Sequence, residues 1–469
     1  MLTHETHTPM LTHAQAEEIF LRLSRFSNAD GLEMLIAGGH SALTRFANNT
    51  IHQNVEEENY VVSVRTVIGR KTARATTNKL EDDSLRRAVE SAEAMTELQV
   101  EDSDLLPMAS APMTEGPPTE RFFENTAALT PEDRARGVET IVSVAKKNGL
   151  TTAGIFSCSR SAEAILNSRG LSTFHAQTSS EISITMLAGD SSGWQKANSP
   201  DARNLDPAAL AEIAARKARD SASPHEVPPG KYTVILEPAA VLDLVGFMFF
   251  DFGAMAILDQ RSFLNNRVGT KLFGENITVD DDVYHPLQSG APFDGEGVHR
   301  QRVRLVENGV VRNLVYARAT AEKMKKSEHA SKVGRIAPTG HGFALPNEIG
   351  EAPMNIVFDA GPEAERRSVD QMIASTDRGI LVTRCWYIRE VDPYEKILTG
   401  MTRDGTFHIE DGKLRHGLRN FRFNQSLIQM LSNVSEMGTP VRASGEESFD
   451  MVVPPMKVRD FNFTEVTKF

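Results

Sequence analysis

Cysteine is scarce in this sequence. The chain has only two cysteines in 469 residues, Cys158 and Cys385, and they lie in different regions. A disulfide framework or a CxxC zinc knuckle needs several suitably spaced cysteines, so neither can be formed here. The amino terminus also lacks the basic start and the apolar run of a signal peptide. These features are typical of a protein in a reducing compartment, and we expect a cytoplasmic location.

Long apolar runs are also missing. Only residues 239–258 could be mistaken for a membrane span, and they include Asp243 and Asp251 near the middle. Ionisable side chains are costly at the centre of a bilayer, so a buried core helix is the better interpretation. We therefore expect no membrane partner.

Basic residues are outnumbered by acidic ones. The chain has 51 Lys and Arg against 63 Asp and Glu, a net charge of −12. Binding to a phosphate backbone depends mainly on neutralising phosphates with Lys and Arg. The charge therefore disfavours nucleic acid as a partner.

Several common catalytic motifs are absent from the sequence. There is no GxSxG nucleophile elbow, no GxxxxGK[ST] phosphate loop and no GxGxxG after a strand. There is also no HExxH or HExxxH, because neither His4-Glu5 nor His225-Glu226 is followed by a second histidine at that spacing. These absences argue against α/β-hydrolase, nucleotide and zinc-hydrolase chemistry within this chain.

One stretch could still be drawn as a metal cluster. In PFDGEGVHRQRV, Asp294, Glu296 and His299 combine carboxylates with an imidazole. The glycines between them are typical of turns and explain the composition without a metal. We therefore assign no metal ligand and no catalytic residue to this stretch.

Two proline-containing linkers divide the sequence into three units. The linkers are residues 101–118 and 223–230. We predict an N-terminal α/β domain at residues 1–115, a middle α+β domain at 119–225 and a mainly β C-terminal domain at 231–469. The fold class is α+β, with a mixed helix and strand N-terminal half and a mainly antiparallel C-terminal half that contains a buried helix.

Local signals support these units. Thr12 and Pro131 mark helix starts, the first through a capping box and the second through proline in the first turn. Asn-Gly at 308–309 and Asp-Gly at 411–412 predict tight hairpins, because both dipeptides favour the turn that joins twisted strands. A further helix is expected over residues 424–434.

The stretch TRCWYIREVDP concentrates polar and aromatic residues in a predicted strand. Strict alternation would place Cys385, Tyr387 and Arg389 on one face of the strand. Arg384, Trp386 and Ile388 would then lie on the opposite face. Charged and aromatic side chains on both faces are unusual for a core strand and indicate a cleft wall or an interface. The alternative is an edge strand with a structural Arg–Asp pair.

Further candidates lie nearby in the sequence. TGMTRDGTFHIEDGK contributes Arg403, Asp404 and His408, and PTGHGFALP places His341 between glycines, where a ligand can approach the backbone. A lone loop histidine is also often simply solvated. The substrate-binding candidates are His341, Arg384, Trp386, Tyr387, Arg389, Asp392, Arg403, Asp404 and His408.

These stretches together resemble the TldD/PmbA (TldE) family, described as metalloproteases and as modulators of DNA gyrase. The matching segments are VILEPAAVLDLV, PFDGEGVHRQRVRLVENGVVRNLVY, PTGHGFALP, GILVTRCWYIREVDP, TGMTRDGTFHIEDGKLRHGLRNFRFNQSL, LTRFANNTIHQN and SVRTVIGRKTARATT. They span most of the chain in the order that the family shows.

The resemblance also locates a departure. It implies HExxxH on the helix after the Glu237-Pro238 strand end, yet Gly246 and Asp251 stand at the histidine positions and Phe247 at the glutamate. The late cysteine of the family is missing too, since the tail after residue 438 has none. Without these ligands a zinc ion would have nothing to fix its geometry or activate its water.

The resemblance therefore implies the zinc-less TldE-like side of the family. Such a subunit would shape the substrate cavity and pair with a zinc-bearing TldD-like homologue as a heterodimer, or form a homodimer, in cytoplasmic limited proteolysis. Its substrate would be a peptide or an unfolded small protein, and zinc would be held only by the partner. The alternatives are a non-enzymatic peptide-binding scaffold, or an independent hydrolase with a site rebuilt from Asp251, His341, Cys385 or His408.

Overall fold

A six-stranded antiparallel sheet forms the N-terminal half of the chain. The computed structural model describes residues 11–110 and 119–467, so part of the predicted first linker lies outside the described residues. The strands are β1 (Gly31–Ala47), β2 (Thr50–Ile68), β3 (Lys71–Thr77), β4 (Thr151–Asn167), β5 (Ser172–Ala188) and β6 (Ser191–Ser199). Their order is β3-β2-β1-β4-β5-β6, so β1 and β4 join the first two predicted units in one sheet.

Helices cover one face of this sheet, at its two ends. They are α1 (His13–Phe26), α2 (Asp82–Leu98), α4 (Pro131–Lys147) and α5 (Pro207–Asp220), with the short α3 (Glu124–Ala127) and η1 (Ala202–Asn204). The first pair packs with Met34 and Val64 in one core, and the second with Ile182 and Ile184 in another. The predicted start of α1 is confirmed, because Thr12 forms a capping box with Gln15.

Two strands in this half are longer than their local sequence patterns indicate. Short strands are suggested by AGIFSCS and STFHAQTS, but β4 and β5 each run for 17 residues. Their many serines and threonines weaken the apolar alternation that marks a strand. These polar residues are nevertheless compatible with the sheet face that helices do not cover.

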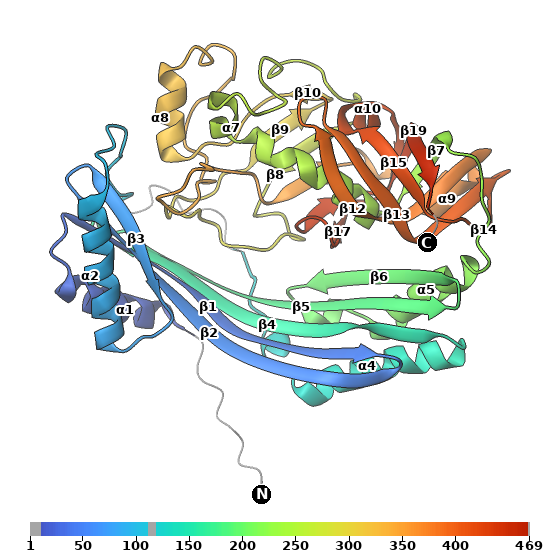
Figure 1. The fold of residues 1–469 in the computed structure, drawn as a ribbon, viewed down its shortest axis with the longest axis horizontal. Helices are drawn as coiled ribbons and strands as arrows, with labels where there is room; N and C mark the ends of the chain where they lie inside the picture. Colours follow the sequence, from blue (N-terminus) through green and yellow to red (C-terminus); the bar gives the residue numbers. More distant parts are fainter. Residues whose placement is uncertain (1–10, 111–118, 468–469) are drawn as a thin grey trace, which may run out of the picture.

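The C-terminal half lies over that other face of the sheet (Figure 1). Its first sheet contains β8 (Thr278–Asp281), β9 (Val303–Glu307), β10 (Val310–Val311), β11 (Ile356–Asp359), β17 (Val441–Ala443) and β18 (Met451–Val453). Beside it lies α8 (Arg318–Lys326) (Figure 1). The segments η3 (Glu363–Glu365) and α9 (Val369–Ala374) follow β11 in the chain, and α9 packs against the other C-terminal sheet. The hairpin predicted at 308–309 is confirmed as the β9–β10 turn.

The second C-terminal sheet closes into a barrel. Its members are β7 (Gly230–Leu236), β12 (Arg378–Asp392), β13 (Ile397–Glu410), β15 (Phe421–Ser426) and β19 (Met456–Val466). They pair in the order β12-β7-β19-β15-β13, and β13 returns to β12. Two further strands, β14 (Lys413–Gly417) and β16 (Val434–Met437), pair with β13 and β19. The hairpin predicted at 411–412 is confirmed as the β13–β14 turn.

The expected buried helix at residues 239–258 is buried but broken. It consists of α6 (Pro238–Val245), the 3-10 segment η2 (Gly246–Phe252) and α7 (Ala254–Leu258), with glycines at both breaks. Within the described residues, no helix is long and apolar enough to cross a membrane. The helix predicted at 424–434 is shorter, α10 (Leu427–Ser432), because Asn424 pairs with Thr399 inside β15 and Ser426 caps the helix instead.

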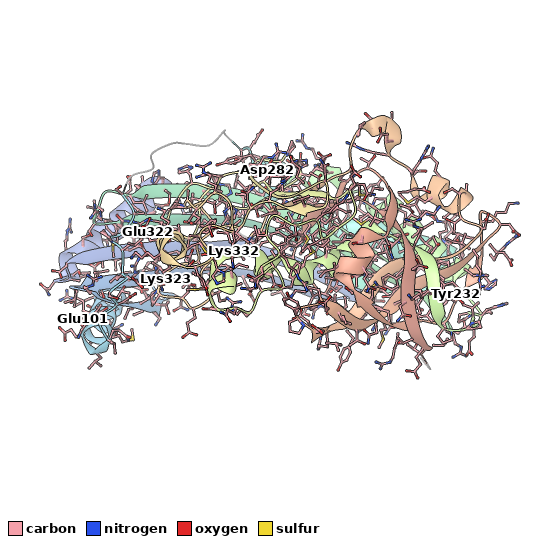
Figure 2. All side chains as sticks on the ribbon, turned by 90° about the horizontal axis from the view of Figure 1, so that it is seen from above. Glu101, Tyr232, Asp282, Glu322, Lys323 and Lys332 are labelled. Atoms are coloured by element: carbon pink, nitrogen blue, oxygen red, sulfur yellow. The ribbon has the colours of Figure 1, made fainter. Side chains whose placement is uncertain are left out.

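Viewed from above, the molecule is elongated. Glu101 of the N-terminal half and Tyr232 at the start of the barrel lie toward opposite ends (Figure 2). The barrel therefore stands at one end of the sheet, beside β6, and the α1–α2 pair stands at the other (Figure 1).

Candidate functional site

Four of the predicted site residues meet where the barrel faces β6. Arg384 and Asp404 form a buried ion pair, with Nε 2.8 Å from Asp404 Oδ2 and a second bond from Nη2. The Arg384 guanidinium lies over the Trp386 ring at 5.3 Å, and the Arg403 guanidinium lies over the same ring at 4.9 Å. We call Arg384, Trp386, Arg403 and Asp404 the arginine–tryptophan cluster.

The sheet completes this cluster with residues that the sequence did not reveal. Trp194 of β6 lies 4.8 Å from the Arg384 guanidinium, and Ser192 Oγ donates to Asp404 Oδ1 at 2.6 Å. Both residues lie in the N-terminal half of the chain, and no local pattern links them to β12 or β13. Only the packing of the barrel against the sheet brings them together.

A polar pocket of about 380 Å³ adjoins the cluster through Asp404. Its walls come from the β5–β6 turn, the connection after α5, and the barrel. Most lining groups are hydroxyls, amides and carboxylates, namely Asp190, Ser191, Ser192, Ser221, Ser223, Asp404, Thr406 and Asn420. Convergent polar groups of this kind can orient a ligand by hydrogen bonds.

Tyr387, Arg389 and Asp392 lie farther along the hairpin, where the predicted alternation is wrong. Tyr387 has φ of 57°, and the β12–β13 register shifts between Trp386 and Arg389. This bulge inserts an extra residue, so Cys385 and Ile388 both point into the core. Tyr387 is 56% exposed, Arg389 lies over its ring at 4.8 Å, and Asp392 accepts hydrogen bonds that form the following turn.

The two histidine candidates occupy other places. His341 is buried, with Nε2 2.9 Å from Asp281 Oδ1 and Nδ1 3.0 Å from Thr339 Oγ1. His408 lies 5.2 Å from the ring of His416, which stacks on His225 at 4.1 Å. Burial lowers the pKa of His408. The contacts of both imidazoles are thus made with residues outside the arginine–tryptophan cluster.

Cys385 lies in the core behind the cluster. Burial raises the pKa of its thiol well above the ordinary value, which opposes formation of a nucleophilic thiolate. Its backbone N–H donates to Asp243 Oδ2, and Asp243 Oδ1 accepts from Glu446 and Glu447 backbone N–H groups, each at 3.3 Å. Burial raises the pKa of Asp243 to about 7. Asp243 thus fastens α6 to β12 and to the 444–450 loop.

The helical segment where the resemblance implies a metal site, residues 246–251, has no free space or free ligands for a metal ion. A Cβ at residue 246 would lie 1.8 Å from Ser448 Oγ, so the 444–450 loop leaves no room for a side chain there. Asp251 is already bound by Lys396, whose Nζ lies 2.5 Å from Oδ2. Among the described residues, no group of three His, Cys, Asp or Glu side chains could hold a metal ion. The residues present therefore do not fit a catalytic zinc.

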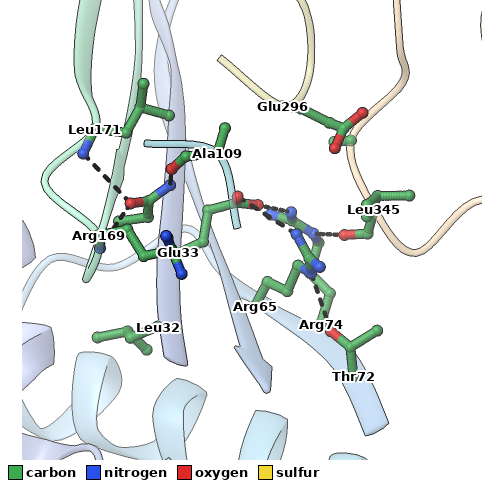
Figure 3. A network of polar contacts seen from close by, with 12 residues as sticks. Leu32, Glu33, Arg65, Thr72, Arg74, Ala109, Arg169, Leu171, Glu296 and Leu345 are labelled. Atoms are coloured by element: carbon green, nitrogen blue, oxygen red, sulfur yellow. Dashed lines mark hydrogen bonds and ion pairs between the residues drawn. The ribbon is translucent and has the colours of Figure 1, made fainter. Parts of the chain in front are cut away.

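A second network joins the sheet to the C-terminal half (Figure 3). Glu33 of β1 accepts from Arg74 at 2.6 Å and from Arg65 at 3.5 Å, and Arg74 Nε also donates to the Leu345 carbonyl at 2.7 Å. Glu33 and Arg65 are almost fully buried. This network fixes the position of the loop that follows His341.

The carboxylates of PFDGEGVHRQRV lie near this network and shape turns. Asp294 Oδ1 accepts from the backbone N–H groups of Glu296 and Val298, both at 2.9 Å, and Oδ2 accepts from Gly342 N–H at 2.8 Å. Burial, reinforced by the charge of Glu296, raises the pKa of Asp294 to about 7. These bonds account for Asp294 as a turn-forming group.

Comparison with known proteins supports the resemblance over most of residues 33–465. Models of the PmbA/TldA metallopeptidase match in order, as domain 1 at residues 33–96, the central domain at 124–222 and the C-terminal domain at 229–465. A protein named metalloprotease from Methanothermobacter thermautotrophicus is 25% identical over 302 residues, 60% of this chain and 61% of that protein. Metalloprotease PmbA of Escherichia coli O157:H7 is 20% identical over 342 residues, 69% of this chain and 68% of that protein.

Solved structures show the same fold. The crystal structure of TldE from Thermococcus kodakarensis matches with a TM-score of 0.82 at 20% identity, covering 96% of this chain and 100% of that chain. The predicted α+β fold class is therefore confirmed. The matched region spans less than two thirds of the archaeal metalloprotease, although the structural match is complete. Because the C-terminal model alone spans half of the chain and the other two precede it in order, this chain belongs to the PmbA/TldD metallopeptidase family.

Proposed function

We propose that this chain is the zinc-less, TldE-like subunit of a cytoplasmic peptidase, active in limited proteolysis together with a zinc-bearing TldD-like homologue. One observation carries the proposal. In a metallopeptidase-family fold, the segment expected to bind metal is closed at Gly246 by Ser448 and occupied at Asp251 by Lys396. Hydrolysis by a bound zinc then has to come from another chain.

The contribution of this chain is to hold the substrate. A peptide offers carbonyl, amide and carboxylate groups, and the arginine–tryptophan cluster offers the Arg403 guanidinium next to Asp404, which lines the polar pocket. Arginine and tryptophan are the side chains that most often anchor such contacts. Arg403 is the accessible member, since 46% of its side chain is exposed. A peptide or an unfolded small protein is the substrate class that this surface suits.

Co-expression with the TldD-like homologue of the same organism tests this function. We expect the two chains to purify together, zinc to follow the homologue, and cleavage of an unstructured fluorogenic peptide to require both chains. Replacing this chain by its Arg403→Gln variant should raise the KM for the peptide while the complex still assembles.

Full peptidase activity from this chain alone, insensitive to chelators, would instead favour an independent hydrolase. Absence of any peptidase activity in the assembled complex would favour a peptide-binding scaffold. A homodimer that forms in preference to the mixed complex would overturn the proposed pairing.

A further inference from the structure

Lys396 places a buried ammonium group inside a set of oxygens. Its side chain is only 4% exposed. Nζ lies 2.5 Å from Asp251 Oδ2, 2.6 Å from Glu390 Oε1 and 3.3 Å from the Phe247 carbonyl oxygen. An ammonium has three N–H donors, so each donor has an oxygen. We call Asp251, Glu390 and the Phe247 carbonyl the oxygen cradle.

The cradle joins two separate parts of the fold. Asp251 and Phe247 belong to η2, whereas Glu390 and Lys396 belong to the turn end of the β12–β13 hairpin. The ring of Phe263 lies 5.4 Å from Nζ. Without the ammonium, two carboxylates would face one another here, and Asp251, which is only 11% exposed, would lose its partner, whereas Glu390 is 31% exposed.

The arrangement resembles the shell of an oxygen-bound metal ion. Calcium binds carboxylate and carbonyl oxygens at about 2.3–2.6 Å, close to the separation between Nζ and the two carboxylates. Carboxylate and carbonyl ligands suit calcium and manganese better than zinc, which prefers nitrogen and sulfur. The cradle thus has the chemistry of a site for a hard divalent cation.

We propose that the oxygen cradle is a cation-binding site whose permanent occupant is the Lys396 ammonium. The lysine supplies the positive charge that the carboxylates need and excludes a metal ion by filling the space between them. In this family fold, the chain therefore carries an internal cation in the segment where its metallopeptidase relatives are expected to carry a metal. Removing the ammonium should convert the cradle into a calcium or manganese site.

A second buried lysine provides a matched control. Lys217 Nζ lies 2.6 Å from Glu237 Oε2, but its other contacts are the neutral oxygens of Trp194 at 3.3 Å and Gln195 at 3.2 Å. Of the described residues, Glu237 is the one carboxylate in that set of bonds. One carboxylate gives a divalent ion much less charge compensation than two. The variant Lys217→Ala should therefore gain no ion.

Isothermal titration of the full chain with CaCl₂ and MnCl₂, after treatment with a chelator, tests the cradle. We expect Lys396→Ala, which leaves room for an ion and its waters, to bind one ion per chain at least tenfold more tightly than wild type or Lys217→Ala. The ion should also raise the unfolding temperature of Lys396→Ala. Adding Asp251→Asn to Lys396→Ala should abolish the gain.

Two results would overturn the proposal. One is a wild-type chain that binds a divalent ion as tightly as Lys396→Ala. The other is no gain of binding in Lys396→Ala or in Lys396→Gln, the variant that keeps a hydrogen-bonding side chain if alanine prevents folding. Failure of both variants to fold even in about 10 mM of either ion would count likewise, because a bound ion stabilises the folded state by mass action. These outcomes do not affect co-purification with a homologue. The proposed subunit pairing and the proposed cation site can therefore be disproved independently.

Discussion

The two ends of the β12–β13 hairpin use the same ionic chemistry in different ways. At the turn, Lys396 lies between two carboxylates and each of its donors has an acceptor. Near the pocket, Arg384 pairs with Asp404, yet its buried Nη1 has no hydrogen-bond partner among the described residues. Arg403 beside it is half exposed. The satisfied cluster stabilises the fold, whereas the proposed peptide binding at the other end depends on the half-exposed Arg403.

The largest expected effect comes from removing the satisfied ammonium. Lys396→Met should lower the free energy of unfolding by about 3 kcal/mol, because it leaves the buried Asp251 carboxylate without its partner. Urea unfolding monitored by circular dichroism measures the loss. The double variant Lys396→Met with Asp251→Asn should recover part of it. An unchanged midpoint in Lys396→Met would show that the turn end is not stabilised by this charge.

A pH dependence should appear at the middle of the hairpin, where Asp243 holds Cys385. The folded pKa of Asp243 is raised to about 7, so between its unfolded pKa and pH 7 the folded state keeps a proton that the unfolded state has lost. Folding then takes up a proton, and the contribution of Asp243 to stability falls as the pH rises, by at most about 1.4 kcal/mol per pH unit.

Asp243→Asn serves as the reference for this effect, because asparagine resembles the protonated acid. The unfolding free energy of wild type minus that of the variant should decrease from pH 5 to pH 7 and level off above pH 8. A difference that is constant over this range would contradict the expected proton uptake.

Removing the partly satisfied guanidinium should affect both stability and binding. Arg384→Met leaves Asp404 buried without its strongest partner, so we expect a loss of about 2 kcal/mol in unfolding free energy. Binding of a fluorescent unstructured peptide should weaken at least tenfold, measured at a temperature where the variant is folded. If peptide binding is unchanged in Arg384→Met, the Arg384–Asp404 pair is purely structural. That result would support the alternative interpretation of TRCWYIREVDP as an edge strand with a structural Arg–Asp pair.

The smallest effect on stability separates binding from folding. Arg403→Gln removes a half-exposed charge, and such surface charges contribute less than about 1 kcal/mol. Its unfolding midpoint should match wild type, while peptide affinity falls several-fold because the charge over Trp386 is lost. Equal affinity in wild type and Arg403→Gln would show that the peptide does not contact Arg403.

Local features were predictable from the sequence, and features set by distant packing were not. The capping box at Thr12 and the turns at 308–309 and 411–412 depend on neighbouring residues, and the structure confirms them. The bulge at Tyr387, which reverses the alternation of β12, could not be predicted. A single residue with left-handed φ has no clear sequence signature unless it is glycine or asparagine.

The candidate site shows the same limit. Arg384, Trp386, Arg403 and Asp404 could be selected because they lie within a short polar stretch of the sequence. Trp194 and Lys396 could not, since Trp194 acts from another sheet and Lys396 has the sequence context of an ordinary surface lysine, DPYEK. His341 and His408 share the composition of the site but lie elsewhere in the fold, and their role stays a prediction.

The pairing of β1 with β4 has a consequence for how the chain is made. The two strands pair along most of their length, although more than a hundred residues separate them in the sequence. During synthesis, β1 to β3 emerge first, and β1 then presents a long unpaired edge until β4 is available. Such an edge is a template for pairing with another nascent copy. The longer residues 78–167 take to emerge, the longer this edge stays exposed.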